Sequence, residues 1–261
     1  MLSHAEILRG AATVAADAAA VLTRMRGAPW DVRRKELRDV VTDADLAAEA
    51  VVLEGLRRLT PGAAILSEEA GASDGGSGER WIVDPLDGTV NYASGLPWFS
   101  VTLGYQRGGV TRVGIVHAPA LGLVATYAEG EGARLNGEPA AVSRTRSLSD
   151  AVISVVLTSH FSPAEVARTV TVIRRLGEVV RGVRIIVSGG LEMCWVAGGQ
   201  TDAFISLKAD AVSHAGAMPM VRAAGGRVTR LDDADARDDD TERVASNGLI
   251  HGELLELVAG A

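Results

Sequence analysis

The spacing of apolar residues predicts two amphipathic helices near the start of the chain. Between residues 3 and 25, apolar side chains recur every three or four positions, which is the period of a helix with one buried face. After a polar segment from Gly27 to Asp39, Thr42 is a good N-cap for a second helix, which a Pro-Gly pair ends. We expect Glu49 and Glu54 of this helix to face solvent. Its expected apolar face contains Leu46, Ala50, Leu53, Leu56 and Leu59.

The middle of the chain alternates between apolar and polar residues, as half-buried strands do. Expected strands cover residues 63–66, 81–83, 100–105, 113–116, 123–127 and 152–157. Asn136-Gly137 is a type I′ turn signal between two further short strands. An antiparallel sheet is therefore expected after the two helices.

Helical and strand-like segments alternate in the C-terminal part of the chain. Helices are expected at 163–176, 191–197, 215–224 and 250–258, and strands at 184–187, 203–207, 227–229 and 243–245. Two helices, an antiparallel middle and an alternating end predict a layered α/β sandwich with two sheets. We expect one domain over residues 1–261, with an N-terminal α+β lobe of about 1–145 and a C-terminal α/β lobe of about 146–261.

Composition narrows the classes of protein to consider. The 261 residues carry a net charge of −7 and the basic residues form no long cluster, so no nucleic-acid partner is expected. Charges interrupt the apolar N-terminal stretch, and no run of about 18 apolar residues suggests a membrane span, which favours a cytoplasmic protein. Cys194 is the only cysteine and lies in an apolar helical run, so we expect a buried thiol rather than a nucleophile.

The most informative chemistry follows the expected strand in the Trp-Ile-Val-Asp-Pro-Leu-Asp-Gly-Thr run. The strand leads directly into a turn with two carboxylates, Asp84 and Asp87. Such a turn would direct both carboxylates and the Leu86 carbonyl at one small volume, and Mg²⁺ prefers oxygen donors of this kind. Gly88 would let a phosphate approach the following backbone amides, and Thr89 adds a hydroxyl. The alternative is a polar turn with solvated aspartates, which the unbroken run of suitable residues disfavours.

Two further acidic segments lie upstream. Glu68 follows the expected strand at 63–66, and Asp43 and Asp45 open the second helix. Each alone is more often an ordinary charged terminus, where aspartates complement the helix dipole. Their meaning therefore depends on the central turn.

Several segments, in order along the chain, share motifs with one known family. They are Asp39–Asp45, Leu66–Glu69, Trp81–Tyr92, Gly95–Pro97, Ser100–Gly104, Cys194–Ala203, Arg222–Gly226 and Ala245–Gly248. The chain thereby resembles the inositol monophosphatase family over nearly its whole length. The resemblance implies an αβαβα sandwich, a homodimer and Mg²⁺-dependent hydrolysis of a small phosphorylated metabolite.

The resemblance also implies the metal ligands. Glu68, Asp84 and the Leu86 carbonyl would bind a first Mg²⁺, and Asp84 would bridge to a second, which Asp87 helps to hold. A bound metal can lower the pKa of its water from about 15.7 towards neutrality, and paired metals stabilise the attacking and leaving oxygens.

The resemblance assigns the remaining catalytic roles to nearby residues. Asp45 and Thr89 would orient the attacking water, while the backbone amides of Gly88 and Thr89 would hold the phosphate. Phosphoryl transfer requires mainly in-line positioning and neutralisation of charge on the phosphoryl oxygens, which agrees with these roles.

The chain departs from the family pattern at two positions. The family normally completes its second metal site with an Asp nine residues before an Arg-Glu-Ala-Gly-Gly-like ending. Here that ending begins at Arg222, and the corresponding residue is Ser213. Seven residues earlier, Ser206 replaces a Glu that contacts substrate in some relatives. Both serines are candidate substrate or phosphate contacts, but a neutral ligand holds Mg²⁺ less well than a carboxylate does.

Three outcomes are open for the second metal. Asp210 would replace the missing acid if the loop is rearranged. His214 would coordinate, although imidazole suits Mg²⁺ poorly and a neutral surface or core histidine is the simpler interpretation. Otherwise the second metal binds weakly or only with substrate phosphate.

Two functional hypotheses follow from the motifs and the departures. The first is a Mg²⁺-dependent phosphomonoesterase that acts on a sugar, cyclitol, histidinol or nucleotide phosphate. The alternative is a relative with lost or altered phosphatase activity, which binds a phosphorylated sugar or nucleotide for non-hydrolytic chemistry or acts as a partner subunit.

Overall fold

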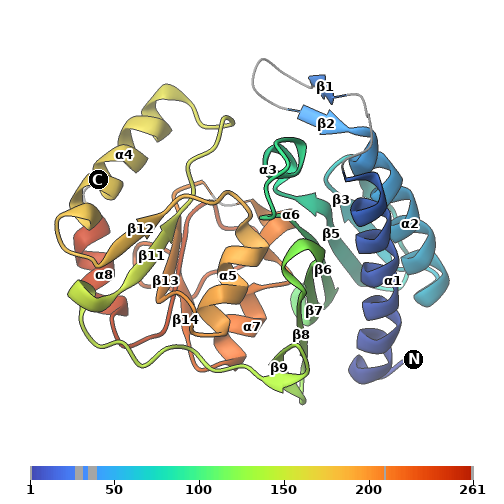
Figure 1. Ribbon diagram of the computed structural model, residues 1–261. Helices are drawn as coiled ribbons and strands as arrows, with labels where there is room; N and C mark the ends of the chain where they lie inside the picture. The colour runs from blue at the N-terminus through green and yellow to red at the C-terminus, as the bar shows by residue number, and fades with distance from the viewer. Residues whose placement is uncertain (1, 27–31, 35–39, 209, 260–261) are drawn as a thin grey trace.

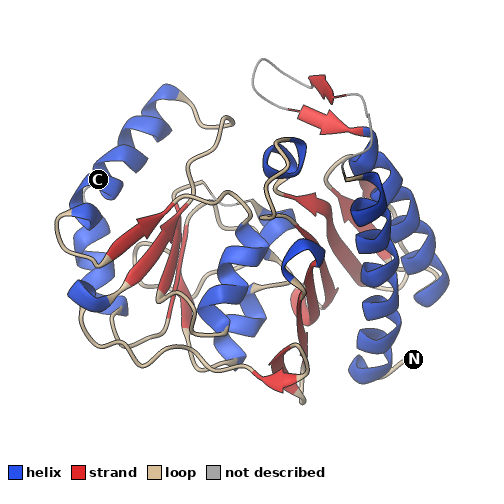
Figure 2. Cartoon of the chain, viewed as in Figure 1, coloured by secondary structure: helices blue, strands red, loops and turns tan. Residues whose placement is uncertain are grey.

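Helices and strands form five layers, in which two sheets are separated and flanked by helices (Figures 1 and 2). This computed structural model describes residues 2–26, 32–34, 40–208 and 210–259. The expected αβαβα sandwich is confirmed. Most of the polar segment expected from Gly27 to Asp39 lies outside the described residues, but strand β1 (Val32–Arg34) pairs antiparallel with β2 (Val40–Thr42).

The first sheet has eight strands in the order β10-β9-β8-β7-β6-β5-β3-β4, and only the β3–β5 pair is parallel. Its strands are β3 (Ala64–Ser67), β4 (Gly71–Ser73), β5 (Glu79–Asp87), β6 (Ser100–Arg107), β7 (Val110–Ala118), β8 (Leu123–Ala128), β9 (Gly132–Leu135) and β10 (Glu138–Pro139). Asn136 and Gly137 connect β9 to β10 with φ angles of 49° and 86°, as the expected type I′ turn requires.

The second sheet has five strands in the order β12-β11-β13-β15-β14. Its strands are β11 (Val152–Val155), β12 (Gly182–Arg184), β13 (Ala203–Ser206), β14 (Arg227–Thr229) and β15 (Arg243–Ser246). The strand expected at 184–187 is wrong in position, because β12 ends where that segment begins. Val187 has a φ of 62°, which lies in the left-handed region and is incompatible with a strand.

Three hydrophobic cores join the layers. Helices α1 (His4–Met25) and α2 (Asp43–Leu59) cover the outer face of the first sheet. Helices α5 (Gly189–Ala197) and α7 (Met218–Ala223) fill the space between the sheets. Helices α4 (Pro163–Gly177) and α8 (His251–Val258) cover the outer face of the second sheet (Figure 1). In the part of the chain that the structure describes, no helix combines the length and apolarity needed to cross a membrane.

The buried face of α2 differs from the expected one. Its fully buried apolar side chains are those of Ala44, Ala48, Val52 and Leu56. Leu46, expected inside, is 41% exposed, whereas Glu49, expected in solvent, is 6% exposed. Glu49 is buried because its Oε1 accepts hydrogen bonds from Ser67 Oγ at 2.5 Å and from the Ala70 amide at 2.9 Å. The inner face of α2 therefore includes a hydrogen-bonded glutamate as well as apolar residues.

The helix expected at 215–224 is shorter than predicted, since only α7 (Met218–Ala223) lies within it, and a separate one-turn helix, α6 (Ala211–His214), precedes it. Pro219 in the first turn of α7 has no N–H to continue a helix from the preceding turn. The connection also passes very close to the first sheet, since a Cβ added at Gly216 would lie 2.6 Å from the Leu103 carbonyl oxygen. The break places α6 at the end of β5, where it becomes part of a pocket.

Candidate active site

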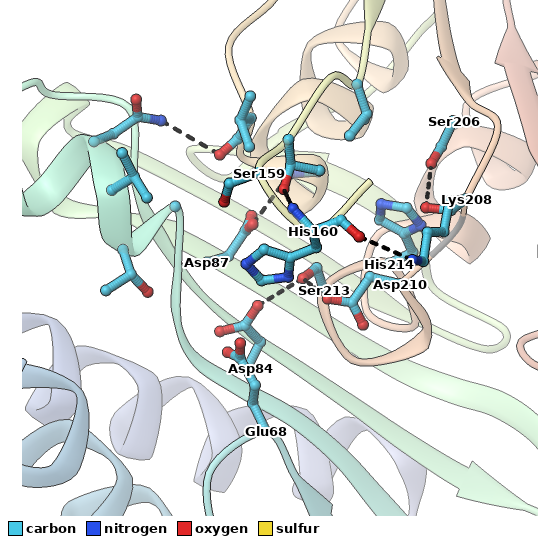
Figure 3. A pocket seen from close by; sticks show the side chains of 18 of the residues that line it. Glu68, Asp84, Asp87, Ser159, His160, Ser206, Lys208, Asp210, Ser213 and His214 are labelled. Carbon is cyan, nitrogen blue, oxygen red and sulfur yellow. Dashed lines mark hydrogen bonds between the residues drawn. The ribbon is translucent and has the colours of Figure 1, made fainter. Parts of the chain in front are cut away.

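A pocket of about 520 Å³ lies where the ends of the two sheets meet. It brings together nearly all the residues predicted to form the site (Figure 3). These are Glu68, Asp84, Leu86, Asp87, Gly88, Thr89, Ser206, Asp210 and Ser213. Asp45 does not line the pocket, but its carboxylate accepts a hydrogen bond from Thr89, which does.

The two central aspartates lie on a β-bulge at the end of β5. Asp84 is opposite Thr102 of β6 and Asp87 is opposite Ser100, so three steps along β5 match two along β6. The expected turn after Asp84 is thus an irregular strand end. Pro85 has no N–H with which to continue the regular ladder at that point.

Asp84 is buried among other acidic groups. Its side chain is 1% exposed, and its Oδ2 accepts a hydrogen bond from Ser213 Oγ at 2.7 Å. Burial raises its pKa well above the ordinary value, and repulsion from the nearby Glu68, Asp87 and Asp210 carboxylates raises it further. A cation would relieve this repulsion.

Asp87 is held by four donors. Its Oδ1 accepts from the Gly189 amide at 3.1 Å, and its Oδ2 accepts from the Gly190 amide at 2.9 Å. The hydroxyls of Ser188 and Ser100 lie 2.8 Å and 3.1 Å from the same Oδ2. Burial outweighs these hydrogen bonds and raises the pKa of Asp87 to about 6. Sequence reasoning missed Ser188, Gly189 and Gly190, although a Ser-Gly-Gly run before an apolar helix was a usable signal.

Two buried side chains fix the segment that donates to Asp87. Asn91 Nδ2 donates to the Ile186 carbonyl at 2.7 Å, and Glu192 Oε2 accepts from the Ser188 amide at 3.1 Å. Between them, Val187 adopts its left-handed φ, a strained conformation that the surrounding contacts maintain. Glu192 is fully buried, which raises its pKa to about 8.

Thr89 and Asp45 form a second hydrogen-bonded unit beside the bulge. Thr89 Oγ1 lies 3.0 Å from both Asp45 Oδ1 and the Leu86 carbonyl oxygen. Asp45 Oδ2 accepts from the Thr42 amide at 2.7 Å and from the Thr42 hydroxyl at 2.5 Å, because Thr42 is the N-cap of α2. Burial raises the pKa of Asp45, although these hydrogen bonds oppose the shift.

Gly88 occupies a position that other residues would not tolerate. It precedes the short helix α3 (Thr89–Ala93) with a φ of 94°, in the left-handed region. A Cβ at this position would lie 2.7 Å from the Trp98 carbonyl oxygen. The backbone path into α3 therefore requires glycine for both reasons.

The position of the missing family acid is occupied by a hydroxyl between two carboxylates. Ser213 Oγ lies 2.7 Å from Asp84 Oδ2 and 3.0 Å from Asp210 Oδ2. Asp210 is also the N-cap of α6, because its Oδ1 accepts from the Val212 amide at 2.9 Å. Asp210 thus lies at the site without any rearrangement of the described loop residues.

His214 and Cys194, two side chains with the potential to coordinate a metal or react, are both buried. His214 is 2% exposed and packs edge-on against Phe204, and burial lowers its pKa well below the ordinary value. It is therefore a neutral core histidine, as the simpler interpretation held. Cys194 is fully buried beside Met220, and burial raises the pKa of its thiol, so the expected structural role is confirmed.

The donor set suits a hard divalent cation. Among the described residues, no three acidic, histidine or cysteine side chains converge closely enough to form a ready-made metal cluster. However, carboxylate oxygens have further lone pairs beyond those that accept protein hydrogen bonds. The buried carboxylates of Asp84 and Asp87 also raise each other's energy when ionised, which a cation would reverse. The residues therefore fit such an ion.

Comparisons with known proteins point to one family. The sequence model of the inositol monophosphatase family matches residues 3–261. A Mycobacterium tuberculosis protein named histidinol-phosphatase is 36% identical over 257 residues, covering 97% of this chain and 98% of its own. A Thermotoga maritima protein named fructose-1,6-bisphosphatase/inositol-1-monophosphatase is 34% identical over 226 residues, covering 87% of this chain and 85% of its own. The solved Thermotoga maritima IMPase structure has a TM-score of 0.86 at 33% identity and 94% coverage of both chains.

Proposed function

Because this chain belongs to the inositol monophosphatase family, we propose that it hydrolyses a small phosphate monoester with the help of Mg²⁺. Its similarity to proteins named as phosphatases supports a phosphoric monoester hydrolase. The observation that carries the proposal is the convergence of a buried carboxylate pair, Asp84 and Asp87, with the Thr89–Asp45 unit at one pocket.

The metal would bind at the bulge of β5. Glu68, Asp84, the Leu86 carbonyl and Asp87 are the donors, and Asp210 would replace the missing family acid only in part, because it lies beside Ser213 rather than at its position. When bound, Mg²⁺ supplies an activated water and neutralises charge on the phosphate. Asp84 contributes most because it lies between the other carboxylates, all of which raise its pKa.

The Thr89–Asp45 unit would position the attacking water. Thr89 Oγ1 donates towards Asp45, which leaves its own oxygen lone pairs to accept a hydrogen from water. Asp45 then receives the proton through the threonine hydroxyl. Because burial raises the pKa of Asp45, it is a stronger base than an exposed aspartate.

The backbone after the bulge would hold the phosphate. The left-handed φ of Gly88 turns the chain into α3, and the missing Cβ leaves the Gly88 and Thr89 amides open to a phosphoryl group. Backbone amides in this setting bind anions without any change in protonation.

A phosphate-release assay tests the proposal. The substrates are inositol phosphates, sugar phosphates, histidinol phosphate, fructose 1,6-bisphosphate and 3′-phosphoadenosine 5′-phosphate, each assayed with and without Mg²⁺. Release that requires Mg²⁺ supports a phosphatase. No release at any Mg²⁺ concentration favours the non-hydrolytic alternative, for which Ser213 at the second metal position is the specific observation.

The expected homodimer, the cytoplasmic location and the single domain with lobes of about 1–145 and 146–261 remain predictions. Both expected lobes contribute residues to the pocket, such as Asp84 and Ser213, which supports a single domain. Light scattering should give about twice the 27.1 kDa chain mass if the dimer forms.

A further inference from the structure

The part of the pocket that Figure 3 shows across from Glu68, Asp84 and Asp87 contains Ser206 and Lys208. The pocket wall also includes the apolar side chains of Val156, Leu157 and Phe161, which follow strand β11. Ser206, the other family departure, is fully buried, and its hydroxyl donates to the Lys208 carbonyl at 2.9 Å. No carboxylate at position 206 is therefore available to accept hydrogen bonds from substrate hydroxyl groups.

Lys208 introduces a positive charge at this end. It is the only lysine or arginine among the described residues that line the pocket, and one of two lysines in the sequence. Its Nζ donates to the His160 carbonyl at 3.0 Å (Figure 3). The lysine side chain therefore reaches from the segment after β13 to the loop before α4.

The Lys208 ammonium remains accessible to a ligand. Its ion-pair partner among the described residues, Glu165, lies 3.4 Å away, and the lysine side chain is 46% exposed. Ion pairs this exposed contribute only about 0–1 kcal/mol, so a substrate anion can displace Glu165 easily.

We propose that Lys208 selects phosphate monoesters that carry a second anionic group, a phosphate or a carboxylate, on the side away from the scissile phosphate. This inference rests on the proposed function, because it assigns the scissile phosphate to the acidic end. The pocket of about 520 Å³ accommodates a six-carbon bisphosphate or phosphosugar acid. A substrate with an ammonium group at that end would be repelled.

Matched substrates that differ only at the far end test the inference. Sorbitol 6-phosphate has a neutral end, 6-phosphogluconate has a carboxylate, and sorbitol 1,6-bisphosphate has a second phosphate. We expect kcat/KM to be about tenfold higher for either substrate with a second anionic group than for sorbitol 6-phosphate, as one charge-assisted contact gives. The comparison of 6-phosphogluconate with sorbitol 1,6-bisphosphate shows which second anion is preferred.

Lys208→Met should reduce that preference to within about twofold, mainly through KM. Arg174→Met is the matched control, because Arg174 is paired with Glu178 on the surface of α4, outside the residues that line the pocket. Equal kcat/KM across the three sorbitol-type substrates, or a preference that survives Lys208→Met, would overturn the inference while leaving the phosphatase intact.

Calorimetry separates this inference from the failure of hydrolysis. Binding of 6-phosphogluconate and sorbitol 6-phosphate is measured in Ca²⁺, without turnover. Tighter binding of 6-phosphogluconate that Lys208→Met removes would support the inference even if no phosphate is released. Equal affinities, or no binding of either compound, would overturn it.

Discussion

Ser213 Oγ donates a hydrogen bond to Asp84 Oδ2 at 2.7 Å, at the position where the family normally has an aspartate. The same oxygen lies 3.0 Å from Asp210 Oδ2. One hydroxyl has one hydrogen to donate, so the two carboxylates share it. The site thus keeps a third acid, Asp210, in contact with the residue that replaced one.

We expect Ser213→Asp to lower the Mg²⁺ concentration needed for half-maximal activity by about tenfold, because it adds a charged ligand beside Asp84. Asp210→Asn should raise it by a similar factor. Phosphate release measured against Mg²⁺ concentration checks both changes. An unchanged requirement in Ser213→Asp would mean that Asp210 already fills the role.

Asp84→Asn should reduce kcat/KM at least about a thousandfold, because metal-derived stabilisation of phosphoryl transfer is worth several kcal/mol. The variant should stay folded, because the burial and raised pKa of Asp84 mean that the fold disfavours its charged form, and asparagine is neutral. Asp17→Asn on the exposed face of α1 is the matched control. Activity near that of the wild type, with a normal melting curve, would contradict the assignment of Asp84 as a metal ligand.

Glu192→Gln should stabilise the protein increasingly as the pH rises. The pKa of Glu192 is about 8 in the folded state, against an ordinary value of 4.5, so folding favours its protonated form. Wild-type stability therefore falls between pH 4.5 and 8, by up to roughly 4 kcal/mol from this group. Urea unfolding at pH 5, 6.5 and 8 should show the difference between variant and wild type growing by that amount. A constant difference across pH, like that expected for the exposed control Glu178→Gln, would show that Glu192 is ionised in the fold.

His251→Asn should make the protein less sensitive to mild acid. His251 is fully buried between Thr229 Oγ1 at 2.8 Å and Ser246 Oγ at 2.7 Å, and burial lowers its pKa to about 4. The neutral ring therefore contributes stability above pH 6.5 that is lost as the pH falls towards 4, up to about 3 kcal/mol. Carboxylates titrate in the same range, so the measurement is the difference in unfolding free energy between variant and wild type. Parallel pH curves would contradict the prediction.

Helix caps and tight turns could be predicted from the sequence, because they depend on residues close together in the chain. Thr42 caps α2 as expected, and Asn136-Gly137 forms its turn, because both depend on contacts within a few residues. The motif from Asp84 to Thr89 was also recognisable, since its donors lie next to one another in the sequence.

Long-range contacts explain what the sequence could not show. The buried face of α2 was wrong because Glu49 finds its partners, Ser67 and Ala70, in a separate strand and turn. The support of Asp87 by Gly189 and Gly190 joins residues about 100 positions apart, and no periodicity encodes such a pairing. The strand expected at 184–187 was misplaced for a similar reason, because Val187 lies in the segment that Asn91 and Glu192 hold from outside.

Helix α2 connects two distant parts of the site through residues one turn apart. Asp45 reaches Thr89, while Glu49 anchors the strand end that carries Glu68. Any shift of α2 along its axis would move Asp45 and Glu49 together. We therefore expect catalysis to depend on the packing of α2 against α1. Gly55 contacts Val14 there so tightly that a methyl group would lie 2.6 Å from a valine carbon. Random mutagenesis scored by turnover should therefore recover activity-lowering substitutions in the contact between α1 and α2 as well as around the pocket.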